Sequence, residues 1–173
     1  MTEAHAFSLE HLLLDASWLG EHVEIGGEER DALLRRVHTY YLYMLRIYGA
    51  KLLYEMELHG AGPEGLARMP QRYAALLTEH LGFAHPTETW LDDVDAGFYA
   101  AQYLRAWMLE AQLRGRWRQA HGERWWAAGG TGEEMRSLWS MGQALPADLL
   151  AAELGMDGLG VDALERRIRE GLA

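Results

Sequence analysis

The sequence predicts an all-α fold with two long helices and several short helices toward the C-terminus. Apolar residues recur every three or four positions through most of the 173 residues, and this is the period of an amphipathic helix. No segment alternates polar and apolar residues for long enough to indicate a strand. Turns containing glycine or proline divide the helical segments without leaving a flexible linker. We therefore expect residues 1–173 to form a single helical domain.

Each predicted helix is bounded by a turn signal. The longest begins after Gly26-Gly27 and continues without proline to Gly60, so at 1.5 Å per residue it would be on the order of 45 Å long. Gly82 ends the next helix, and Gly129-Gly130 follows the second long one. The predicted helices span residues 2–14, 28–59, 64–81, 93–121, 132–142, 146–154 and 161–171.

Composition limits the classes of function. The net charge of −10 results from 26 acidic and 16 basic residues, which disfavours nucleic acid or an anionic membrane as a partner. The absence of cysteine excludes disulfides, thiol catalysis and Cys-ligated zinc. No apolar run reaches the roughly 18 residues of a membrane span, and the N-terminus lacks a basic region followed by an apolar stretch. We expect a cytoplasmic protein without a nucleic-acid or membrane partner.

Two carboxylates near the start of the chain share one helical face. Glu3 and Glu10 are seven residues apart, about 20° short of two full turns, and their neighbours are mostly apolar. Burying carboxylates on such a helix is costly unless they bind a cation or accept hydrogen bonds. Two interpretations remain open: an exposed polar stripe with His5 and His11 at its edge, or part of a metal site.

Histidine spacing gives no complete metal motif. The sequence contains eight histidines but no H-E-x-x-H, the helical motif that places two imidazoles on one face. One Glu/His pair at four-residue helical spacing, Glu55 with His59, lies near the end of the longest predicted helix. We interpret this pair as part of a solvated helix terminus.

A second group of candidates lies in the segment Gly97–Tyr103. Tyr99 and Tyr103 are four residues apart and project from one face of the predicted helix. Their hydroxyls could donate hydrogen bonds to a developing oxyanion or to a substrate carbonyl. Aromatic packing explains the same spacing, so both interpretations remain open.

Together these segments resemble the C-terminal part of zinc metallopeptidases of the thimet oligopeptidase and oligoendopeptidase F family, and more distantly the related metallocarboxypeptidases. Glu3–Glu10 is similar to the helix that follows H-E-x-x-H in those enzymes. Asp93–Tyr103 resembles their tyrosine-bearing segment near the scissile bond. Gly142–Leu150, followed by Leu154–Asp157, is similar to their closing G-x-x-x-P-x-x-L-L stretch and the turn after it.

The resemblance implies peptide-bond hydrolysis by a zinc-activated water. In this sequence it makes Glu3 the third zinc ligand and Glu10 the carboxylate that supports the metal site. It makes Tyr103 and Tyr99 the contacts to the oxyanion or substrate. Peptides would be the substrates of the complete enzyme, and zinc its cofactor.

The chain also departs from the family pattern. The two zinc histidines and the general-base glutamate have no counterpart, and Asp93 and Asp95 stand where the family usually has a histidine. Because a catalytic zinc normally has three protein ligands, we expect the isolated chain to be inactive and to hold no zinc tightly. An N-terminal peptidase half or a second copy of the chain would be its partner. The alternative is a non-catalytic all-α interaction protein built on a peptidase-like scaffold.

Overall fold

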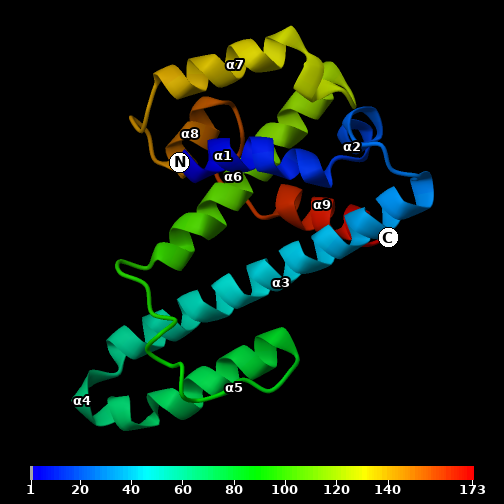
Figure 1. Ribbon diagram of the computed structural model, residues 1–173. Helices are drawn as coiled ribbons and strands as arrows, with labels where there is room; N and C mark the ends of the chain where they lie inside the picture. The colour runs from blue at the N-terminus through cyan, green and yellow to red at the C-terminus, as the bar shows by residue number, and fades with distance from the viewer. Residues whose placement is uncertain (1) are drawn as a thin grey trace. The chain divides into compact units, whose positions relative to one another are not determined.

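The computed structural model describes residues 2–173, and this part of the chain is all-α, with no strand among the described residues. Figure 1 follows the helices from blue to red. In chain order the α-helices are α1 (Thr2–Glu10), α2 (Ala16–His22), α3 (Gly27–Gly60), α4 (Gly62–Gly65), α5 (Met69–Leu81), α6 (Tyr99–His121), α7 (Gly129–Ser140), α8 (Ala147–Glu153) and α9 (Asp162–Leu172). The short 3-10 helices are η1 (His11–Leu14), η2 (Leu66–Arg68) and η3 (Trp125–Ala127).

The two long helices and the short C-terminal helices confirm the predicted fold class. The longest helix, α3, extends one residue beyond its predicted span at each end. The second long helix starts later than predicted, at Tyr99 rather than at residue 93, because Gly97 and Phe98 both have positive φ, at 66° and 56°. A helix cannot run through two left-handed residues, so residues 93–98 form a loop with turns instead.

Local chemistry explains two further differences. The helix α2 was not predicted; Asp15 caps it, accepting hydrogen bonds from the backbone N–H groups of Ser17 and Trp18. The predicted helix 64–81 is divided, and its main part, α5, begins next to Pro70. Proline is favoured in a first helical turn and disfavoured in the interior because it has no N–H to donate. At the other end Gly82 adopts φ 81° as the C-terminal cap.

The chain forms two compact units. Unit 1 comprises the described residues up to Tyr40 together with Arg105–Ala173, and unit 2 comprises Tyr41–Leu104. Within unit 1, His11 of η1, which directly follows α1, and Arg167 of the C-terminal helix α9 both contact Glu110 of α6 (Figure 1).

Each unit has its own apolar core. The buried core of unit 1 consists of Ala4, Ala106, Leu109, Leu113, Trp117, Trp125, Met135, Leu138, Ala147, Leu150 and Ala151. The buried core of unit 2 consists of Ala50, Tyr54, Leu58, Met69, Tyr73, Leu76 and Leu77. No helix within residues 2–173 combines the length and the apolar character needed to cross a membrane.

Candidate functional site

The tyrosine segment in unit 2 starts from an unusual backbone turn. Gly97 tolerates its positive φ, but Phe98 carries a side chain and still adopts φ 56°. Non-glycine residues in this region are uncommon and cost on the order of 1–3 kcal/mol when strained. The Phe98 ring contacts the imidazole of His59 edge-on at 5.2 Å. The turn fixes where α6 begins and therefore where Tyr99 stands.

Tyr99 and Tyr103 lie together at the start of α6, as their spacing predicts. Their ring centroids are 5.1 Å apart in an edge-to-face arrangement, and the Tyr103 ring is 5.2 Å from that of Tyr48 on α3. Tyr99 is 42% exposed, whereas Tyr103 is half-buried. Aromatic packing is thus present, but it leaves the Tyr99 side chain open to solvent.

A buried carboxylate anchors the loop before the tyrosines. Glu55 is fully buried, so our interpretation of it as part of a solvated helix terminus is wrong. Its Oε1 accepts a hydrogen bond from the backbone N–H of Asp95 at 3.0 Å. The Asp95 side chain accepts a hydrogen bond from Lys51 at 3.2 Å. Glu55 and Lys51 are one turn apart on α3, so a single helix face holds the loop at two points.

The same loop is anchored a second time, to α5. The hydroxyl of Tyr73 donates to Asp93 and accepts from the Thr89 hydroxyl at 3.1 Å. Burial and the contact with Asp93 raise the pKa of the Tyr73 phenol. Asp93 and Asp95 therefore form structural contacts to Tyr73 and Lys51.

Unit 1 carries the predicted metal ligand on α1. Glu3 is half-buried and Glu10 is exposed, while Ala4 and Ser8 on the other side of the helix are buried. The Ser8 hydroxyl donates to the Ala4 carbonyl at 2.9 Å, which satisfies it inside the core. Glu3 thus stands at the border of the core, and its assignment as a ligand remains a prediction.

A buried charge network in unit 1 was not predicted. Glu110 on α6 is fully buried, and its carboxylate contacts three cationic or polar side chains. Arg114 Nε donates to Oε1 at 2.9 Å, His11 Nδ1 lies 2.8 Å from Oε2, and Arg167 of α9 also donates to Oε2. His11 is buried and stacks on Phe7 at 5.4 Å, so its expected position at the edge of an exposed stripe is wrong.

The electrostatics of this network follow from burial and from its two guanidinium groups. Burial alone would raise the pKa of Glu110, but Arg167, Arg114 and His11 together hold it well below its usual range. Burial lowers the pKa of His11, and the two arginines lower it further although Glu110 acts in the opposite direction. At neutral pH the network therefore contains an ionised Glu110 and an uncharged His11.

A sequence signal for the network existed. Glu110 and Arg114 have the four-residue spacing of a helical ion pair, and their α6 neighbours Leu109 and Leu113 are apolar and buried. A charged pair within an apolar stretch indicates a buried pair rather than a surface one. The contributions of His11 and Arg167 depend on tertiary contacts and carry no such local signal.

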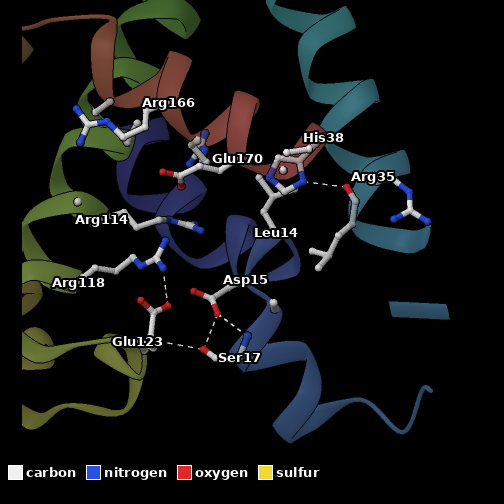
Figure 2. Close-up of a pocket in the computed structure, with 18 of the residues that line it drawn as sticks. Leu14, Asp15, Ser17, Arg35, His38, Arg114, Arg118, Glu123, Arg166 and Glu170 are labelled. Carbon is white, nitrogen blue, oxygen red and sulfur yellow. Dashed lines mark hydrogen bonds and ion pairs between the residues drawn. The ribbon is translucent and has the colours of Figure 1, made fainter. Parts of the chain in front are cut away.

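A cavity of about 640 Å³ opens beside this network within unit 1. Its walls come from the start of α2 and from α3, α6 and α9. Figure 2 shows Arg114, Arg118, Arg166 and Glu170 around this space, with His38 on the α3 side. Burial lowers the pKa of His38, whose Nδ1 lies 2.8 Å from the Leu34 carbonyl oxygen.

The described residues do not assemble a zinc ligand set. No group of three or more histidine, cysteine, aspartate or glutamate side chains within residues 2–173 is arranged to hold a metal ion. Comparison with protein-family models, curated proteins and solved structures finds no match for the chain.

Proposed function

We propose that the chain is the C-terminal, substrate-cleft portion of a zinc-dependent oligopeptidase. The observation that carries the proposal is the Tyr99–Tyr103 pair, presented at the start of α6 by the left-handed turn at Gly97 and Phe98. A strained backbone at a non-glycine residue is characteristic of functional sites. The segment with this geometry is also one of the three that resemble the peptidase family.

In this proposal the phenols act as hydrogen-bond donors. A hydroxyl aimed at the carbonyl oxygen of a scissile peptide stabilises the negative charge that develops there. Tyr103 is held between the rings of Tyr48 and Tyr99, which limits its reorientation during the reaction. The loop anchors at Glu55 and Lys51 hold the backbone from which the pair projects.

The metal chemistry is assigned to a segment beyond the described residues. Glu3 would supply one zinc ligand and Glu10 a supporting carboxylate, but one carboxylate does not make a catalytic site. The proposal therefore requires an H-E-x-x-H segment, either upstream in the same reading frame or in a separate peptidase half. Peptides are the proposed substrates of the completed enzyme.

The test begins with the genomic sequence before Met1, where an H-E-x-x-H motif is expected in frame or in the preceding gene. The encoded polypeptide is then combined with this chain, and cleavage of a quenched fluorescent peptide is measured with and without a chelator. We expect chelator-sensitive cleavage only in the combination, and Tyr103→Phe to lower kcat by roughly 10²–10³-fold. Tyr40→Phe, at an exposed tyrosine of α3, is the matched control.

Two results would overturn the proposal. Chelator-sensitive cleavage with stoichiometric zinc in the purified chain alone would show that the ligand set is complete without a second segment. An upstream region without H-E-x-x-H, together with no cleavage in any combination, would remove the peptidase assignment itself.

A second candidate, a non-catalytic interaction protein, is favoured by exposed apolar side chains in unit 2. Leu53 and Met56 lie one turn apart on α3 and are 46% and 60% exposed. Phe83 and Leu91 are also largely exposed. Clusters of exposed apolar residues commonly mark partner surfaces. A clean gene start with its own ribosome-binding site, and no peptidase segment, would support this candidate.

A further inference from the structure

One guanidinium group beside the cavity of unit 1 is only partly used by the protein. Arg114 is 5% exposed, and its Nε donates to Glu110. Its Nη2 is buried and has no hydrogen-bond partner among the described residues. The indole ring of Trp125 covers one side of the group, with Arg114 Cζ 5.4 Å from the ring centroid. A buried donor without an acceptor is costly, more so when it is charged.

The charges around Arg114 leave a place for an anion. Arg114 and Arg167 both donate to the single carboxylate of Glu110. Asp15 is the next carboxylate and interacts electrostatically with Arg114. However, Asp15 already accepts hydrogen bonds from the first backbone amides of α2 and from the indole of Trp125. The Nη2 group therefore has no acceptor among the described residues, although Arg114 lines the cavity.

Small residues create the space next to this group. Ala111 and Gly115 lie one turn apart on the cavity side of α6, and a Cβ added at Gly115 would meet nothing within 4 Å. Opposite them, Gly171 of α9 lies against the His38 ring; a Cβ there would be 2.1 Å from Cδ2. Gly115, Gly171 and His38 all line the cavity.

We propose that this cavity binds a small oxyanion, a carboxylate or a phosphate, that accepts a hydrogen bond from Arg114, with Arg166 in the cavity wall. Arg118 also lines the cavity, but its Nη2 already donates to Glu123 (Figure 2). Guanidinium groups match the geometry of carboxylate and phosphate oxygens. The volume of about 640 Å³ is in the range of small-molecule sites. Asp31, Glu123 and Glu170, which also line the cavity, oppose the anion electrostatically. The site lies within unit 1 and does not depend on the peptidase proposal.

The test measures binding of two probes, inorganic phosphate and succinate, by isothermal titration calorimetry and by the shift in Tm. Sodium chloride at matched ionic strength is the reference, because a general effect of ionic strength would raise the Tm of the protein equally in chloride and in the probe solution. We expect saturable 1:1 binding of at least one probe and a Tm increase beyond that in chloride. Binding of phosphate alone assigns a phosphate ligand, and binding of succinate alone assigns a carboxylate ligand.

Four variants distinguish binding of the anion in the cavity from binding on the protein surface. Gly115→Leu should weaken binding at least tenfold by filling the space, and it retains the fold because leucine is a better helix former than glycine. Arg166→Gln should weaken binding severalfold and Glu170→Gln should strengthen it. Arg136→Gln, at an exposed arginine of α7 outside the cavity, should have no effect.

The proposal fails on either of two results. One is the absence of saturable binding of both probes to the wild-type chain. The other is binding that Gly115→Leu leaves unchanged, or that Arg136→Gln weakens as much as Arg166→Gln does, since either result would place the anion on the surface. Arg114→Lys is a further check: the folded variant should bind the probe with at least tenfold lower affinity than the wild-type chain.

Discussion

The two units treat a fully buried glutamate in opposite ways. Glu110 of unit 1 contacts two arginines and a histidine, whereas the hydrogen bond to Glu55 of unit 2 comes from one backbone N–H and its Oε2 has no hydrogen-bond partner among the described residues. The first arrangement requires an ionised carboxylate, because two guanidinium groups depend on it. The second requires only one acceptor oxygen. Burial alone therefore does not show whether a carboxylate stabilises the fold through its negative charge or only through one hydrogen-bond acceptor oxygen.

The largest expected effect is the difference in folding stability lost when each buried glutamate is replaced by glutamine. Glu110→Gln should destabilise the fold by about 3–5 kcal/mol, because it leaves the buried guanidinium of Arg114 and the partly buried one of Arg167 without their counter-charge. Glu55→Gln keeps the acceptor oxygen for Asp95 and should cost less than about 1 kcal/mol. Urea unfolding followed by circular dichroism measures both. Equal losses for the two variants would show that the charge of Glu110 has no special role.

Acid should reduce the difference in stability between the wild-type chain and the Glu110→Gln variant. The folded-state pKa of Glu110 lies below its unfolded value of about 4.3. Its contribution to stability is therefore complete above that value and is lost as the pH falls below it. We expect the stability difference between the two proteins to shrink between about pH 4.5 and pH 2. Urea midpoints across this range test this, and a constant difference would contradict it.

Two buried tyrosines of unit 2 provide a smaller, matched contrast. Tyr73→Phe removes a hydroxyl that bonds Asp93 and Thr89 and should cost about 1–3 kcal/mol. The Tyr54 hydroxyl is buried without a hydrogen-bond partner among the described residues, so Tyr54→Phe should be neutral or slightly stabilising. Thermal unfolding of both variants is the measurement. A loss at Tyr54 as large as at Tyr73 would indicate a partner for its hydroxyl.

The smallest expected effect is on folding stability at alkaline pH. Burial raises the pKa of Tyr54 to about 12, from an ordinary value of 10.0. A raised folded-state pKa contributes stability that is present below pH 10 and is lost as the pH rises toward 12. The Tyr54→Phe variant should therefore lose less stability than the wild-type chain between pH 10 and 12, as measured by urea unfolding at each pH. If the wild-type chain and the Tyr54→Phe variant lose the same stability over this range, groups other than Tyr54 cause the loss.

The sequence predicts the fold class because helical periodicity is a local property. The prediction for α3 is correct to one residue at each end, since glycine turns bound an uninterrupted apolar repeat. The predicted start of α6 was wrong because nothing in the residue types shows that Phe98 adopts a left-handed conformation. The helix α2 was missed although Asp15 carries its capping signal, because the helix has only seven residues.

The candidate sites were predictable to a smaller extent. Spacing places Tyr99 and Tyr103 on one helix face, and the structure brings their rings into contact. The buried positions of His11 and Glu55 depend on which helix face meets another element. That information is tertiary, and a single sequence with helical periodicity on several faces does not contain it.

The Glu110 network also has a consequence for synthesis of the chain on the ribosome. His11 precedes Glu110 by 99 residues and Arg167 follows it by 57. At 5–20 residues per second, translation reaches Arg167 about 3 to 11 seconds after Glu110. During that interval the carboxylate lacks one of its two guanidinium partners, which makes early burial unfavourable. We therefore expect the interior of unit 1 to reach its final packing only after α9 emerges, which leaves its nascent apolar surface open to chaperones.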